Sequence, residues 1–180
     1  MAIKKWEILK SEYLFKRPWL TVRKDALRLP NGTIHDEFYV LEYPEWINVI
    51  AEDTDGNLIL ERQYRPGLKE ISTEICAGVV EKGEDVLTAA QRELKEETGY
   101  EGGEWTKLMT IAPNPGNMNN HCHCFLAKGV RRTSGQQLDK TEDIEFFTLP
   151  KDQVYDLLCR GEFHQALMVA PLWKYFATRI

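Results

Sequence analysis

Excess positive charge, long apolar segments and paired cysteines are all missing from this 180-residue chain, and each absence argues against a class of protein. Because the net charge is -5, we do not expect nucleic acid as a partner. No run of about 18 apolar residues occurs, so we expect no membrane-spanning helix and no membrane partner. The first residues, MAIKKWEILK, contain no apolar signal segment, and a cytoplasmic protein is therefore predicted.

The cysteines are few and scattered. Cys76, Cys122, Cys124 and Cys159 form no CxxC pair and are too sparse for a disulfide framework, so we expect free thiols. The stretch HCHC, from His121 to Cys124, raises the alternative of a zinc site. Successive residues of a strand face opposite sides, however, and this would separate the histidines from the cysteines. The favoured interpretation is a half-buried strand with its cysteines packed inward.

The composition is that of a globular domain, with 43% hydrophobic and 11% aromatic residues. Apolar and polar residues alternate on both sides of Asn31-Gly32, a pair typical of tight turns, which predicts an N-terminal hairpin. A second turn, TDGN, separates predicted strands at 46–51 and 58–64. Three later strand-like runs are TKLMTIAP, CHCFLAKGV and DIEFFTLP.

Helical spacing first occurs in residues 86–98, where Leu87, Ala90 and Leu94 share one face and Gly99 follows as a stop. Two later helices are predicted at 151–159 and at about 165–177, and Pro171 must either begin or kink the second. This order of elements predicts a mixed sheet with one helix inserted after its middle strands and two helices at the end.

The predicted helix carries the sequence RELKEE, with three glutamates within five residues. Glu93 and Glu97 are about one helical turn apart, beside the face on which Leu94 must be buried. Desolvation and mutual repulsion favour protonated carboxyls, whereas a bound divalent cation favours the ionised forms. Oxygen ligands of this kind suit Mg²⁺, with Mn²⁺ as a close substitute. The alternative is an ordinary solvated helix face, which RELKEE alone would not exclude.

A longer pattern favours the metal. Gly78 is followed after five residues by Glu84 and, after seven more, by RELKEETGY. This pattern resembles the signature of the Nudix hydrolase family, with Tyr100 in place of the usual aliphatic residue. The segments ERQYRPG and EICAG, together with Pro115, are similar to the ADP-ribose pyrophosphatase subgroup, although Cys76 stands where that subgroup usually has proline.

The resemblance implies the Nudix α/β/α sandwich, an α/β fold with a mixed sheet between helices, plus an N-terminal antiparallel β-hairpin. It implies a hairpin region at 1–43 that serves dimerisation and substrate contact, and a Nudix hydrolase domain at 44–180. A homodimer is expected on the same basis. The implied metal ligands are the backbone carbonyl of Ala77 with Glu93 and Glu97. Glu96 and Glu84 would bind a further metal or support these ligands, and Arg92 would orient the glutamates.

The implied reaction is Mg²⁺-dependent hydrolysis of the pyrophosphate bond of ADP-ribose, or of a related nucleoside diphosphate sugar, to a nucleoside monophosphate and a sugar phosphate. Glu142 is the candidate general base, with Asp143 as the second choice. Candidate substrate contacts are Arg65 in preference to Arg62, Arg23, Pro115 and Trp46, the last of which could equally be a core residue. The alternatives are a GDP-mannose or dinucleoside polyphosphate hydrolase and, from another class, a nucleotide sensor without turnover.

Overall fold

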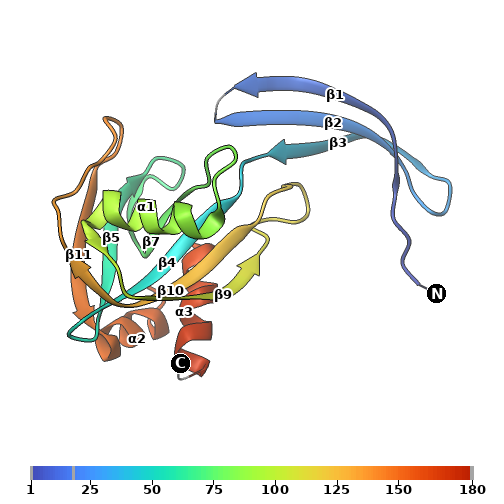
Figure 1. Ribbon diagram of the computed structural model, residues 1–180. Helices are drawn as coiled ribbons and strands as arrows, with labels where there is room; N and C mark the ends of the chain where they lie inside the picture. Colours follow the sequence, from blue (N-terminus) through green and yellow to red (C-terminus); the bar gives the residue numbers. More distant parts are fainter. Residues whose placement is uncertain (1, 18, 179–180) are drawn as a thin grey trace. The chain divides into compact units, whose positions relative to one another are not determined.

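The computed structural model describes residues 2–17 and 19–178, which form two compact units. The first unit comprises the chain up to Pro44 together with Ala112–Asn120. Its strands β1 (Glu7–Arg17), β2 (Leu20–Arg28) and β3 (Ile34–Glu42) form an antiparallel sheet in the order β1-β2-β3 (Figure 1). Gly32 has a positive φ of 87° in the turn between β2 and β3, as the Asn-Gly pair predicts. The hairpin prediction is confirmed, and β1 adds a third strand that the sequence pattern did not reveal.

The second unit contains an eight-stranded mixed sheet. Its main path runs β11-β5-β4-β10-β8, with β6 beside β5, β7 beside β4 and β9 beside β10. The strands are β4 (Trp46–Asp53), β5 (Asn57–Arg65), β6 (Glu70–Glu74), β7 (Cys76–Val79), β8 (Tyr100–Glu101), β9 (Glu104–Ile111), β10 (Cys122–Arg132) and β11 (Ile144–Pro150). Strands β4 and β10 are parallel, whereas the other pairs of this sheet are antiparallel.

Strands β4 and β5 separate along their length. They pair through only two residue pairs, Ala51 with Ile59 and Glu52 with Leu58. Beyond this point β7 continues the ladder beside β4, and β6 continues it beside β5. Between the diverging strands, side chains of β5 and β7 lie close to side chains of helix α1 (Val86–Thr98).

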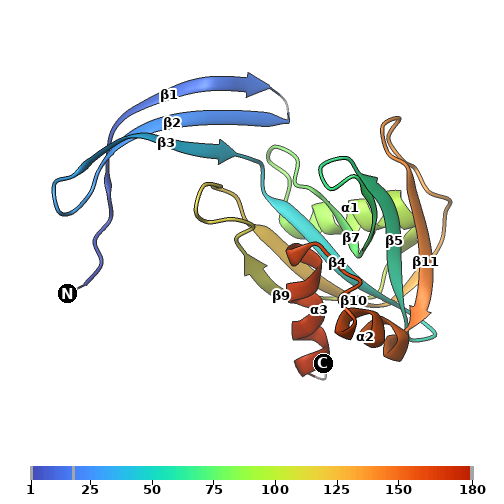
Figure 2. The ribbon, with the colours of Figure 1, turned by 180° about the vertical axis from the view of Figure 1, so that it is seen from behind.

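Helices cover both faces of the mixed sheet, so the predicted α/β/α sandwich is confirmed (Figures 1 and 2). Helix α1 (Val86–Thr98) lies on one face and packs through Ala89, Ala90 and Leu94. Helices α2 (Lys151–Cys159) and α3 (Ala166–Thr178) lie on the other face. Successive side chains of β4 point to opposite faces of the sheet. Ile47 and Val49 face α1, whereas Ile50 faces α2 and α3. None of the helices within the described residues is long and apolar enough to cross a membrane.

Helix α1 is fixed by a cap at each end. The carboxylate of Asp85 accepts hydrogen bonds from the backbone N–H groups of Leu87 and Thr88, at 3.0 and 3.2 Å. Gly99 ends the helix in the left-handed region, with φ 77°, and its N–H donates to the carbonyl of Lys95. A side chain at this position would also press against the backbone of Ser134. The helix therefore spans the residues that the sequence predicts.

Pro171 lies inside α3 and does not begin it. A proline has no N–H to offer the carbonyl of residue 167, four positions earlier. That carbonyl, of Leu167, instead accepts a 2.6 Å hydrogen bond from the side-chain amide of Asn48 on β4. The buried Asn48 thus supplies a donor that the helix cannot supply for itself.

The cysteines of HCHC are packed inward, as predicted. Cys122 and Cys124 are buried in the layer of α2 and α3. His123 points to the opposite side of β10, where its Nε2 lies 2.7 Å from Glu45. The separation of the two residue types argues against the zinc alternative for this stretch.

Candidate metal-binding active site

Arg92 is the centre of the acidic cluster on α1. Its Nε and Nη2 donate to the two carboxylate oxygens of Glu84 at 2.9 and 3.0 Å, so the loop before the helix folds back as its length predicts. Its Nη1 donates to Glu93 and Glu96 at 2.9 and 3.0 Å. Nη2 also donates to the carbonyl of Val79 at 3.1 Å. One guanidinium therefore holds three of the predicted site carboxylates and anchors them to the end of β7.

Glu93 and Glu97 lie at the boundary between helix and sheet. The Glu93 side chain is 13% exposed and Glu97 is 4% exposed. Glu97 accepts a 3.3 Å hydrogen bond from the backbone N–H of Ala77 on β7. Glu93 packs over Gly78, so closely that a β-carbon at that position would overlap its side chain. The glycine of the pattern is thus required by the close approach of a carboxylate to the strand.

Burial changes the proton affinity of these carboxyls. It raises the pKa of Glu97 to about 8, and the neighbouring charges of Glu93 and Glu142 act in the same direction. Burial also raises the pKa of Glu93, although Arg92 opposes that shift. By contrast, the hydrogen bonds from Arg92 lower the pKa of Glu84. Of these three carboxyls, the two predicted ligands, Glu93 and Glu97, are therefore the ones whose ionised forms need a positive partner.

A count of charges shows what the cluster lacks. Glu84, Glu93, Glu96 and Glu97 carry up to four negative charges, and Arg92 supplies one positive charge. Glu97 forms no ion pair within the described parts of the chain. Oxygen donors from two carboxylates, beside the half-buried Ala77, are the ligand set of a hard divalent cation. The residues present can therefore hold such a metal.

The other predicted catalytic residue comes from the loop before β11. Glu142 is exposed, and its carboxylate accepts a 2.9 Å hydrogen bond from the backbone N–H of Asp139. Its charge contributes to the raised pKa of both Glu93 and Glu97, so it is within electrostatic reach of the cluster. Asp143 is exposed in the same loop.

The predicted arginines of β5 have different partners. Arg65 forms a forked ion pair with the buried Glu74, through Nε at 2.8 Å and Nη2 at 2.5 Å. Its side chain remains 36% exposed. The guanidinium of Arg62 instead stacks over the ring of Phe147, with its central carbon 4.4 Å from the ring centre. This contact fits the structural role expected for one of the two arginines.

The three remaining predicted substrate contacts belong to other segments of the chain. Trp46 is partly buried and packs against the apolar layer of α2 and α3, which favours the core alternative. Arg23 belongs to the first unit, where it pairs with Glu42 and, at 2.9 Å, with the buried Asp25. Pro115 is exposed in the 112–120 loop of that unit.

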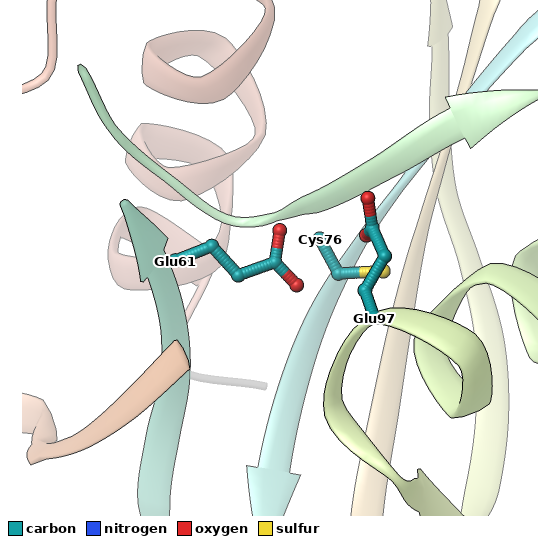
Figure 3. Close-up of side chains that lie close together, drawn as sticks. All are labelled: Glu61, Cys76 and Glu97. Carbon is teal, nitrogen blue, oxygen red and sulfur yellow. The ribbon is translucent and has the colours of Figure 1, made fainter. Parts of the chain in front are cut away.

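Sequence reasoning missed two buried residues beside the cluster. Glu61 of β5 is fully buried, and Cys76 of β7 is 1% exposed. Figure 3 shows their side chains close to that of Glu97. Burial raises the pKa of both groups, and the charge of Glu97 adds to each shift. The departure of Cys76 from the usual proline was a signal at this position, whereas nothing in the strand pattern marked Glu61.

Two family models match this chain. The model of the NUDIX domain matches residues 43–168, and that of the nucleoside diphosphate sugar hydrolase N-terminal domain matches residues 6–41. The chain therefore belongs to the Nudix family, and it is a hydrolase of that family.

Individual proteins agree with this assignment. The chain is 33% identical to a methanol dehydrogenase activator of Bacillus methanolicus, over 81% of this chain and 78% of that protein. It is 30% identical to an ADP-ribose pyrophosphatase of Bacillus subtilis (strain 168), over 86% and 84% of the two chains. A crystal structure of an ADP compounds hydrolase matches 99% of this chain and 96% of its own, with a TM-score of 0.87 and 25% identity. The predicted family and fold are confirmed.

Proposed function

We propose that this enzyme hydrolyses the pyrophosphate bond of ADP-ribose, or of a related nucleoside diphosphate sugar, to a nucleoside monophosphate and a sugar phosphate. The observation that carries the proposal is the carboxylate pair of the half-buried Glu93 and the buried Glu97, which lies against β7 within the family signature. Relatives named ADP-ribose pyrophosphatase support the choice of substrate.

The proposed cofactor is Mg²⁺, with Mn²⁺ as a substitute, held by Glu93, Glu97 and the carbonyl of Ala77. Glu96 and Glu84 would hold a further ion or support these ligands. A bound divalent cation supplies charge neutralisation at the phosphate oxygens and lowers the pKa of water. The oxygen-only donor set supports this choice over softer metals.

Arg92 is proposed to orient the site and not to touch the reacting atoms. Its hydrogen bonds to Glu84, Glu93 and Glu96 fix the directions of three carboxylates. Glu142 is proposed to accept the proton of the attacking water at its carboxylate, with Asp143 as the second candidate. The exposure of Glu142 and its electrostatic effect on Glu93 and Glu97 support this role.

Arg65 is the favoured contact to the substrate phosphates. Its Nε and Nη2 are taken by Glu74, and Nη1 donates no hydrogen bond to the described residues. A guanidinium that is already oriented by a buried carboxylate loses little freedom when it binds a phosphate. Arg23, Pro115 and Trp46 stay predicted contacts to the substrate.

A homodimer that uses the N-terminal sheet is also proposed. All 11 residues of β1 are exposed, and they include Ile8, Tyr13, Leu14 and Phe15. Exposed apolar side chains on a strand are a surface that a second copy of the chain can cover. Sedimentation analysis should give twice the 20.9 kDa chain mass. A monomer at micromolar concentration would count against this part of the proposal.

The cytoplasmic location stays a prediction.

Product analysis tests the reaction. ADP-ribose, ADP-glucose, GDP-mannose and a diadenosine polyphosphate should be compared in the presence of Mg²⁺, with nucleotide products separated by chromatography. We expect ADP-ribose to give AMP and ribose 5-phosphate with the highest kcat/KM. Preference for GDP-mannose or the dinucleotide would move the assignment to the corresponding alternative. Binding of nucleotide without any turnover would refute the enzymatic proposal in favour of a sensor.

A further inference from the structure

Glu61, Cys76 and Glu97 meet where β4 and β5 separate. They come from three elements, β5, β7 and α1, and each is buried. One ligand atom of each, a carboxylate oxygen or the thiol sulfur, lies within 4.8 Å of the other two. In the view of Figure 3 the cysteine lies between the two glutamates. Two carboxylate oxygens, which are hard ligands, and one thiol sulfur, which is a soft ligand, thus lie together in the interior.

Glu61 is the member of this group that most needs a partner. It is fully buried, and neither of its carboxylate oxygens has a hydrogen-bond partner within the described residues. Nearly all buried polar atoms in proteins are paired, and an ion is one of the recognised reasons for an apparent exception. The side chain points toward Cys76 and Glu97, so a cation between the three would satisfy it.

We propose that Glu61, Cys76 and Glu97 form a second metal position, which takes a thiophilic divalent cation such as Zn²⁺. Glu61 and Cys76 are not among the proposed Mg²⁺ ligands, whereas Glu97 belongs to both sets of ligands. The inference rests on the proposed function only through this shared carboxylate. Occupation by Zn²⁺ would withdraw Glu97 from the Mg²⁺ site, so zinc would inhibit hydrolysis.

The geometry of the group is close to that of a zinc site. Tetrahedral zinc with bonds of about 2.3 Å to sulfur and about 2.1 Å to oxygen sets its ligand atoms about 3.4 to 3.6 Å apart. The three atoms lie within 4.8 Å, so side-chain rotations that bring them closer by about 1 Å suffice. The fourth position is left for water or for a substrate oxygen.

The proton and charge balance also favours a thiophilic ion. Binding releases the thiol proton of Cys76 and any carboxyl proton to solvent, and the sulfur and the two carboxylates donate electron pairs to the metal. Two positive charges then face three negative ligands. Without the ion, the charge of Arg65 acts on Glu61 and Glu97, but its guanidinium is already paired with Glu74. Mg²⁺ gains little from sulfur, whereas Zn²⁺ binds thiolate strongly. Selection between the two metals follows from the cysteine.

Cobalt(II) is the probe for this site, because a thiolate ligand gives it a sulfur-to-cobalt charge-transfer band in the near ultraviolet. The full chain should carry Cys159→Ser, which removes the exposed thiol. We expect one cobalt ion per chain to produce the band and equimolar Zn²⁺ to abolish it. In the same background, Cys76→Ser should eliminate the band. Glu61→Gln should keep the band and weaken cobalt binding by more than about tenfold.

Several results would overturn the proposal. They are the absence of a band in the Cys159→Ser protein, an undiminished band after Cys76→Ser, and unchanged cobalt affinity after Glu61→Gln. Should Cys76→Ser fail to fold, X-ray absorption at the zinc edge of the Cys159→Ser protein still decides, because the site requires a sulfur at about 2.3 Å. Hydrolysis of ADP-ribose in Mg²⁺ is measured separately. Lack of turnover would refute the proposed function and leave the cobalt band in place.

Discussion

Gly78→Ala tests whether the position of Glu93 controls the active site. Gly78 faces the side chain of Glu93, and an added β-carbon would lie 2.5 Å from Cγ of Glu93 and closer still to its carboxyl group. Carbon atoms in normal contact are about 3.5 to 4.0 Å apart, so the carboxylate must move by about 1 Å or more. The backbone at Gly78 has no positive φ, so the substitution adds no backbone strain of that kind.

The size of the effect follows from that displacement. A misplacement of about 1 Å in an active site can lower turnover by about 10²-fold, which corresponds to about 2.7 kcal/mol of transition-state stabilisation. The flexible end of Glu93 can yield, so the free energy of unfolding should change by about 1 kcal/mol at most. We therefore expect a large loss of activity and of Mn²⁺ affinity in a protein that is nearly as stable as the parent.

The assays are Mg²⁺-dependent hydrolysis of ADP-ribose, calorimetric titration with Mn²⁺ and urea unfolding. Gly67→Ala is the matched control, because a β-carbon there would contact nothing within 4 Å and its φ is not positive. Both measures of function should be unchanged in the control. Normal Mn²⁺ affinity and normal turnover in Gly78→Ala would show that the Glu93 carboxylate is not a ligand.

Glu97→Gln should lower turnover by orders of magnitude while the protein stays folded, because it removes a charged ligand and keeps the shape; near-normal kcat would contradict the metal assignment. Leu94→Ala should lower the free energy of unfolding by about 2 to 5 kcal/mol, since Leu94 is fully buried, whereas the exposed Leu68→Ala should change it by about 0.5 kcal/mol or less in urea unfolding. Mn²⁺ affinity should rise with pH and level off above about 8, because the raised pKa of Glu97 means that the ion must displace a proton at lower pH. Titrations at pH 6, 7 and 8.5 that give one affinity would refute this coupling.

Local signals in the sequence were sufficient for the elements that hold the predicted ligands. Helix α1 is set by its own apolar spacing and by Gly99, whose N–H caps the last turn. The hairpin of β2 and β3 is set by Asn31-Gly32. Because these signals act within a few residues, the predicted boundaries of α1 agree with the structure.

Features that depend on distant partners were not predicted. Strand β1 is exposed along its whole length, so it shows no alternation of buried and exposed residues and is defined only by its pairing with β2. Glu61 follows three buried residues of β5, a strand covered on both faces, where polarity does not reveal orientation. The pairing of Arg65 with Glu74 depends on β6 lying beside β5. The spacing of residue types along the sequence does not indicate which distant segments pair with one another.

The 112–120 segment has a consequence for shortening this protein. It is hydrogen-bonded to residues 41–44 of the same unit. The N–H of Leu41 donates to the carbonyl of Asn117 at 2.7 Å, and the N–H of Tyr43 donates to Oδ1 of Asn119 at 3.1 Å. The side-chain amide of Asn120 donates to the carbonyl of Pro44 at 2.9 Å. A truncated polypeptide beginning at Glu45 would retain this excursion between β9 and β10 but lose all three anchors. The chain passes between the two units at three places, after residues 44, 111 and 120. Isolation of the second unit therefore also requires a new connection between β9 and β10 in place of residues 112–120.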